Sequence, residues 1–220
     1  QYAYAFVQQD ADEAEGQDLE TALRLRERAR KLYLRARGYG LRGLEVRHPG
    51  FEAALKGNPK TAAARATKAD VPLLYWTAAA WASAISLSKD RPDVVADLPA
   101  AEALVDRALE LDEAYDAGAL HVFLITYEMS RPGGGAGAAA RSRSHYDRAV
   151  QLSGGFMASP YVALAEAVCV KEQDRAGFRE LLEKAVALDV DAKPDWRLQN
   201  LISQRRARWL LARSDELFVE

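Results

Sequence analysis

The hexapeptide Asp106-Arg-Ala-Leu-Glu-Leu111 recurs twice, as Asp147-Arg-Ala-Val-Gln-Leu152 and as Glu183-Lys-Ala-Val-Ala-Leu188. Each copy reads acid, base, alanine, branched aliphatic residue, any residue and leucine, and successive alanines lie 41 and 36 residues apart. A period of this size is typical of helical-hairpin repeats. The small alanine lets the second helix of each hairpin approach its neighbour closely, while the charged pair stays in water. The pattern therefore predicts stacked helical hairpins.

A weaker fourth copy, Glu27-Arg-Ala-Arg-Lys-Leu32, has its alanine 79 residues before that of the first full copy, which leaves room for one unit whose motif has decayed. The spacing resembles that of tetratricopeptide repeats, about 34 residues per unit, although their Trp-Leu-Gly-Tyr signature is missing. We therefore expect an all-α chain in which residues 1–220 form a single tetratricopeptide-like domain. Its cryptic repeats would stack into a curved solenoid.

Around these motifs the sequence predicts further helices and their ends. Between Asp18 and Gly38, apolar residues recur at spacings of three and four, which indicates one amphipathic helix that stops at Gly38. Asp174 and Ser159 are expected helix starts, and Arg131-Pro-Gly-Gly-Gly-Ala-Gly137 is an expected loop between two antiparallel helices. Four prolines near further helix starts cost no hydrogen bond there: Pro49, Pro59, Pro72 and Pro99.

The first helices of the hairpins are expected at residues 73–88, 117–130, 159–172 and 195–213. In solenoids such helices line the concave surface, where extended ligands bind. The first of them lies in a run of 18 residues without a charge, from Val71 to Ser88. That run contains a proline and several serines and falls short of the roughly 20 apolar residues that a membrane span needs. We expect a core helix, which either packs on all sides or also lines an apolar cavity with Trp76 and Trp81.

Composition and charge exclude several classes of protein. The chain has 49% hydrophobic and 28% charged residues and a net charge of -2, so it has no overall field that would attract nucleic acid or an anionic membrane. The basic segment Arg24–Arg47 follows the acidic segment Asp10–Glu20, and we expect the two to neutralise one another. The single cysteine, Cys169, excludes an intramolecular disulfide and is expected to be a small buried apolar residue.

No catalytic or metal-binding set can be assembled from spacing alone. The three histidines lack any zinc-ligand spacing, and the glycine-rich loop lacks the features of a phosphate-binding loop. Ser86-Leu-Ser-Lys89 spells S-x-x-K without the companion motifs of that hydrolase class. His121 shares a helix stripe with Glu128 and lies either in a groove or between packed helices. Arg205 lies near Asn200, and its helix presents either a carboxylate-binding fork or an ordinary solvated face.

Several longer segments occur together and in a fixed order along the chain. They are Leu74-Tyr-Trp-Thr-Ala-Ala-Ala-Trp81, Gly118-Ala-Leu-His121, His145-Tyr-Asp-Arg-Ala-Val-Gln-Leu-Ser153, Gln173-Asp-Arg with Phe178, Leu181-Leu-Glu183, and Asn200-Leu-Ile-Ser-Gln-Arg-Arg-Ala-Arg208. Together they resemble the T component (TatT) of TRAP transporters. The resemblance covers nearly the whole chain.

The resemblance implies a periplasmic, lipid-anchored, non-enzymatic accessory protein built from degenerate tetratricopeptide-like helix pairs. The lipid-bearing cysteine would lie before Gln1, and the membrane would be reached only through that anchor. The expected assembly is a homotrimer that docks the solute-binding P component of a TRAP system. Each subunit would present an apolar groove or channel for a small hydrophobic or carboxylate ligand. No cofactor, metal or nucleic acid is expected.

We expect the ligand-binding residues to lie on the predicted first helices. They are Tyr75, Trp76 and Trp81 as apolar wall, His121, Tyr127 and Tyr161 as polar groups, and Asn200 with Arg205 at the carboxylate end. Two other functions stay open. One is a purely protein-binding tetratricopeptide scaffold without a small-molecule site, and the other is a hydrolase that uses Ser86 or His121.

Overall fold

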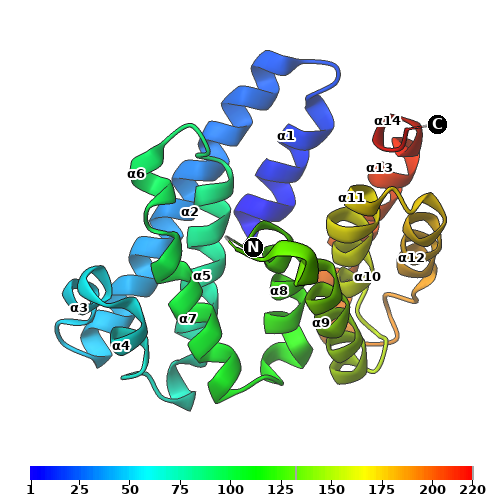
Figure 1. The fold of residues 1–220 in the computed structure, drawn as a ribbon. Helices are drawn as coiled ribbons and strands as arrows, with labels where there is room; N and C mark the ends of the chain where they lie inside the picture. The colour runs from blue at the N-terminus through cyan, green and yellow to red at the C-terminus, as the bar shows by residue number, and fades with distance from the viewer. Residues whose placement is uncertain (132, 220) are drawn as a thin grey trace. The chain divides into compact units, whose positions relative to one another are not determined.

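The computed structural model describes residues 1–131 and 133–219, and its regular structure within them is helical, without a strand (Figure 1). The all-α prediction is therefore confirmed. The chain divides into two compact units, unit 1 from Gln1 to Tyr115 and unit 2 from Asp116 to Glu220. The single repeat domain and the solenoid stay predictions.

Unit 1 contains a π-helical turn and seven α-helices among its described residues, connected by short turns (Figure 1). They are η1 (Tyr4–Gln8), α1 (Gln9–Ala14), α2 (Leu19–Arg47), α3 (Phe51–Gly57), α4 (Pro59–Ala63), the 3-10 turn η2 (Lys68–Asp70), α5 (Val71–Ser86), α6 (Pro92–Val95) and α7 (Leu98–Leu111). The carboxylate of Asp18 accepts a hydrogen bond from the Thr21 N–H and begins α2. Pro59 and Pro72 lie in the first turns of α4 and α5, as their positions predict.

The expected stop at Gly38 is wrong, because α2 continues past it to Arg47. Gly40 and Gly43, further along, face α5: a Cβ at Gly40 would collide with the Thr77 hydroxyl, and one at Gly43 would lie 3.0 Å from a methyl of Leu73. Each glycine costs a helix about 1 kcal/mol relative to alanine. Here the two glycines instead let α2 and α5 approach closely, and the resulting packing holds the helix together.

Helix α5 is the centre of unit 1, because it packs against both α2 and α7. Its buried side chains include Leu74, Trp81 and Ile85, so the uncharged run forms a core helix. In the part of the chain that the structure describes, no helix combines the length and apolar character needed to cross a membrane.

Unit 2 continues the chain with paired helices (Figure 1). They are α8 (Ala119–Ser130), the 3-10 turn η4 (Gly135–Gly137), α9 (Ala138–Ser153), α10 (Ser159–Leu164), the π-helical turn η5 (Ala165–Cys169), α11 (Val170–Glu172), α12 (Arg175–Ala187), the 3-10 turn η6 (Pro194–Trp196), α13 (Arg197–Ala212) and α14 (Ser214–Leu217); the turn η3 (Tyr115–Gly118) precedes them. The glycine-rich loop joins α8 to α9 as predicted, except that Pro132 lies outside the described residues.

The two expected helix starts in unit 2 have different outcomes. The Asp174 carboxylate accepts a hydrogen bond from the Gly177 N–H at 2.9 Å and caps α12. Ser159 is instead the first residue inside α10. The capping position is Ala158, whose N–H donates to the Asn200 side chain. The proline at 160 is compatible with this start because its missing N–H lies in the first turn.

The repeated alanines are all fully buried, with an exposed fraction of 0% at Ala29, Ala108, Ala149 and Ala185. The last three lie on α7, α9 and α12, which pack against α5, α8 and α10 respectively. The backbone approaches closely at one of them: a Cβ at Gly118, which precedes α8 with φ +94°, would lie 3.3 Å from the Ala149 Cα. The small residue therefore does what the motif predicts, which is to allow two helices to touch.

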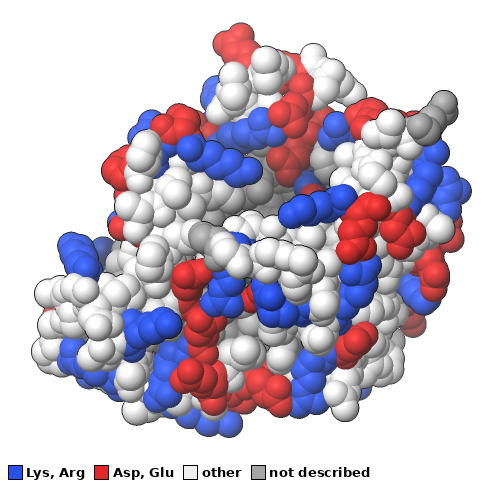
Figure 2. Space-filling model, in the orientation of Figure 1, with Lys and Arg blue, Asp and Glu red and all other residues white. Residues whose placement is uncertain are grey.

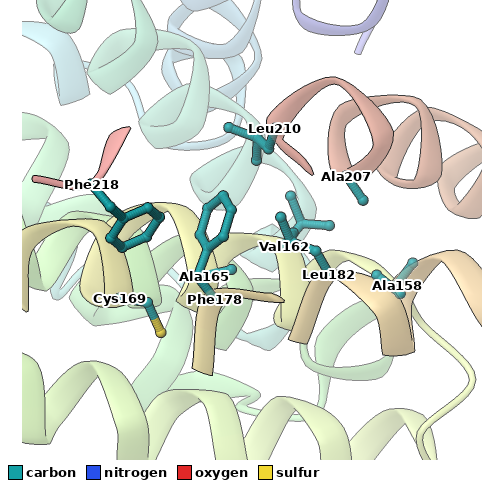
Figure 3. Packing of buried hydrophobic residues seen from close by; sticks show 10 residues of the cluster. Ala158, Val162, Ala165, Cys169, Phe178, Leu182, Ala207, Leu210 and Phe218 are labelled. Atoms are coloured by element: carbon teal, nitrogen blue, oxygen red, sulfur yellow. The ribbon is translucent and has the colours of Figure 1, made fainter. Parts of the chain in front are cut away.

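The core of unit 2 gathers side chains from α10, η5, α12 and α13 (Figure 3). The rings of Phe178 and Phe218 meet edge to face, with their centroids 5.0 Å apart. Cys169 lies in the same cluster as a free, buried thiol, and burial raises its pKa to about 11. The prediction of a small buried apolar residue at this position is confirmed.

Candidate functional site

An aromatic cluster in unit 1 contains two of the predicted ligand-binding residues. The ring of Tyr75 meets Trp76 edge to face at 4.9 Å and lies 5.6 Å from the ring of Tyr115, measured between centroids. Trp76 is 38% exposed and, with Gln1, lines an open hollow of about 340 Å³. The exposed part of the Trp76 indole offers apolar surface that a hydrophobic ligand can cover.

Trp81, the third predicted wall residue, is buried in an internal polar contact. Its indole N–H donates to the Asp97 carboxylate at 3.3 Å, and the Arg37 guanidinium lies 4.8 Å from its ring centroid. Arg37 also pairs with Asp97 at 3.2 Å. These three side chains join α2 and α5 to the residue that precedes α7. The structure thus gives Trp81 a packing role, and its contact with a ligand stays a prediction.

In unit 2, His121 lies between two packed helices. It is buried on α8, and its Nδ1 atom is 2.9 Å from the Nδ1 atom of His145 on α9. Of the two alternatives that the sequence leaves open for His121, the geometry favours the histidine held between helices. Burial lowers the pKa of His145 below its ordinary value, and the neighbouring His121 lowers it further.

Tyr127 and Glu128 lie near the end of α8, and both are buried. The Tyr127 ring stacks on Phe123 at 5.5 Å between centroids. The Glu128 carboxylate binds Arg131 at 2.6 Å and Arg141 at 2.5 Å. Burial acts to raise the pKa of Glu128, but the two arginines outweigh it and hold the pKa below its ordinary value. This cluster holds the ends of α8 and α9 together across the glycine-rich loop.

The remaining predicted residues occupy separate places in unit 2. Tyr161 is half-buried and meets Tyr146 edge to face at 5.7 Å. Asn200 is buried, and its amide bonds backbone groups only: it accepts from the Ala158 N–H and donates to the Phe156 carbonyl, both at 2.9 Å. Because both ends of this amide are occupied, Asn200 positions the start of α10 and is poorly placed to receive a carboxylate.

Arg205 is half-exposed, whereas its neighbour Arg206 is buried. Arg206 forms an ion pair with Glu166 and stacks over the Trp209 ring at 4.4 Å. These contacts fix Arg206 in the fold, and the expected carboxylate-binding role of Arg205 stays a prediction.

Sequence reasoning missed the aromatic side chains at the start of the chain. Tyr2, Tyr4 and Phe6 are each about half exposed, and the rings of Tyr2 and Phe6 lie 5.7 Å apart. The spacing of four between Tyr2 and Phe6 places them on one helix face, which is the signal that could have found them. Gln1 beside Trp76 was missed as well, and no pattern in the sequence indicates it.

Charges on the surface are mixed. Figure 2 shows Lys and Arg side chains interleaved with Asp and Glu over the visible face. Within unit 1, Arg26 on α2 lies 2.8 Å from Glu15 and 3.6 Å from Asp12, so part of the basic segment is neutralised by the acidic one as expected. Among residues 1–131 and 133–219 no three His, Cys, Asp or Glu side chains converge as a metal site. Ser86 donates its hydroxyl to the Ser83 carbonyl of its own helix.

Comparison with known proteins agrees with the family to which the sequence motifs point. Residues 1–218 match the family described as TAtT, TRAP transporter T-component. The chain belongs to this family. It is a family of transport accessory proteins and not an enzyme family, and membership implies association with a TRAP transport system. A protein of Treponema pallidum (strain Nichols) that carries the name "Uncharacterized protein" is 30% identical over 223 residues, which cover 100% of this chain and 69% of that protein.

Proposed function

We propose that this T-component protein is a non-enzymatic periplasmic accessory protein of a TRAP transport system. It docks the solute-binding P component and presents an apolar groove to a hydrophobic ligand that carries a carboxylate. The observation that carries this proposal is the family match over residues 1–218. In the same proposal the protein is lipid-anchored and assembles as a homotrimer.

The aromatic cluster around Trp76 supports the ligand-binding part of the proposal. Trp76 combines a partly exposed indole with an adjacent hollow, while Tyr75 supports it from one side. Covering apolar surface contributes roughly 25 cal/mol per Å², so a ligand that covers one face of the indole gains more than 1 kcal/mol from this residue alone. In unit 2, a carboxylate contact at Arg205 stays a separate part of the proposal, independent of the cluster around Trp76.

Palmitate is a suitable probe because it combines an alkyl chain with a carboxylate. We expect Trp76→Ala to weaken palmitate binding about tenfold, as the loss of about 1.4 kcal/mol would. Trp196→Ala in unit 2 removes a half-buried indole outside the cluster and serves as the matched control. Both variants are checked for folding by circular dichroism. If wild type and Trp76→Ala bind palmitate with equal affinity, the aromatic cluster is not the ligand site.

The exposed aromatic side chains favour a second candidate, a protein-binding scaffold without a small-molecule site. Tyr2, Tyr4 and Phe6 project from one short segment, and aromatic residues are enriched at protein interfaces. Native mass spectrometry of freshly purified protein separates the two functions. A retained small molecule supports the groove, whereas its absence together with failed palmitate binding supports the scaffold.

Docking and assembly are tested directly. The tagged chain should capture the purified P component of its own TRAP system, and light scattering of the chain alone should give three times the monomer mass. Failure to capture the P component would overturn the docking proposal, and a monomer mass would overturn the trimer.

A further inference from the structure

Three polar contacts connect α8 to α9 at successive turns of unit 2. His121 meets His145 through their Nδ1 atoms at 2.9 Å. One turn further along α8, the Ile125 carbonyl accepts a hydrogen bond from the buried Ser142 hydroxyl at 2.9 Å. Beyond it, Glu128 meets Arg141 at 2.5 Å. The two helices are thus joined at three levels, and the histidine pair is the level built from imidazole, the one side chain whose unperturbed pKa lies near neutral pH.

The geometry of the pair limits how many protons it can hold. A hydrogen bond between two Nδ1 atoms requires that one ring carries the Nδ1 proton while the other accepts with its lone pair. A first extra proton can bind the donating ring at Nε2, which leaves this bond intact. A second one must occupy the accepting Nδ1, and two N–H groups would then face each other at 2.9 Å. The contact breaks at this step.

We propose that His121 and His145 form a pH-sensitive joint between α8 and α9, closed with at most one bound extra proton and opened by the second. The joint is regulatory in character and does not depend on the ligand or partner proposed above. The geometry fixes the direction of the pH response: acidification opens the joint, because the second proton breaks the contact between the two Nδ1 atoms.

The charged groups around the joint do not offset the cost of binding the second proton. Glu128 on α8 attracts a proton, but Arg131 and Arg141 repel it and already pair with that carboxylate. Helix α10 and the turn η5 also pack on this hairpin. Their titratable groups are engaged elsewhere: Tyr161 packs on Tyr146, Glu166 pairs with Arg206 and Cys169 is buried. Helix α9 also carries Asp147, Arg148 and Arg143, and Arg143 pairs with Glu172. The turn before α8 carries Asp116.

The sign of the pH effect follows from linkage. The pKa of His145 is below its ordinary value of 6.5 in the folded chain, so the unfolded chain binds more protons between these two values. The stability that the closed pair contributes is complete above pH 6.5 and is lost as the pH falls through the lowered pKa. Within that window the open population rises up to about tenfold per pH unit for one proton.

Hydrogen exchange at pH 7.5, 6.5 and 5.5 tests the joint. We expect the protection factors of α8 and α9 amides, which correct for the intrinsic pH dependence of exchange, to fall several-fold or more between the last two values. In His145→Asn the carboxamide oxygen can still accept from His121 Nδ1 but cannot titrate, so this fall should disappear. His48→Gln changes the third histidine, which lies in unit 1 beside Asp70, and should leave the fall unchanged.

Nitrogen-15 NMR of the histidine rings in the wild-type chain supplies a readout that needs no variant. We expect one ring to gain its proton at distinctly lower pH than the other. Two rings that titrate together near pH 6.5 would overturn the proposal, as would α8 and α9 protection factors that do not change with pH or that change equally in His145→Asn.

Discussion

At the scale of single residues, the Thr77 hydroxyl makes a sharp test of the α2–α5 contact. Thr77 is completely buried, and its Oγ1 has no hydrogen-bond partner among the described residues. A buried polar group without a partner costs roughly 1–3 kcal/mol, so Thr77→Val should raise the free energy of unfolding by about 1 kcal/mol. Urea denaturation measures this change.

The matched control is another buried hydroxyl, that of Ser142, which donates to the Ile125 carbonyl. Ser142→Ala leaves that carbonyl without its side-chain donor and should lower the free energy of unfolding by about 1 kcal/mol. If Thr77→Val were as destabilising as Ser142→Ala, the Thr77 hydroxyl would have a hydrogen-bond partner in solution, contrary to the prediction.

Residue types and spacing predict candidate side chains but not what those side chains contact. Trp76 and Trp81 lie five apart in one apolar run, yet one is partly exposed and the other is buried on Asp97. Asn200 satisfies two backbone groups 42 and 44 residues earlier in the chain. Such partners come from tertiary packing, which no local pattern encodes, whereas the buried alanines follow directly from their repeated spacing.

At the scale of helices, α2 offers a comparison between two glycines with opposite surroundings. A Cβ at Gly38 meets only the end of the Arg42 side chain, at 3.9 Å, whereas one at Gly40 collides with Thr77. Alanine favours a helix over glycine by about 1 kcal/mol. Gly38→Ala should therefore raise the melting temperature by a few degrees, while Gly40→Ala should lower it because α2 and α5 must separate.

Thermal unfolding followed by circular dichroism compares the two variants under identical conditions. An equal rise in both would mean that α2 and α5 are not in close contact. The same glycines explain why the end of α2 could not be predicted from sequence. A glycine after an apolar stripe indicates a helix stop, and only the position of α5 shows that Gly40 and Gly43 serve packing instead. Most helix starts could be predicted, because caps and prolines act locally.

At the scale of the whole molecule, the division into two compact units predicts that a buried substitution acts within its own unit. Asp70 in unit 1 and Glu128 in unit 2 are buried carboxylates held by arginines. Removing one charge of a buried ion pair leaves its partners uncompensated. We expect Asp70→Asn and Glu128→Gln each to destabilise the chain by about 2 kcal/mol, with faster hydrogen exchange confined to the unit that contains the substitution.

The loss of folding stability at acidic pH should also be confined to the unit that contains each carboxyl group. The pKa values of both carboxyl groups are lowered in the folded chain, so the stability they contribute is present above their ordinary values and is lost as the pH falls through the lowered ones. In Glu128→Gln the part of this loss that belongs to unit 2 should vanish, while unit 1 keeps its own. Exchange that accelerates equally in both units would instead show that residues 1–220 unfold as one cooperative structure, and it would contradict the division into two units.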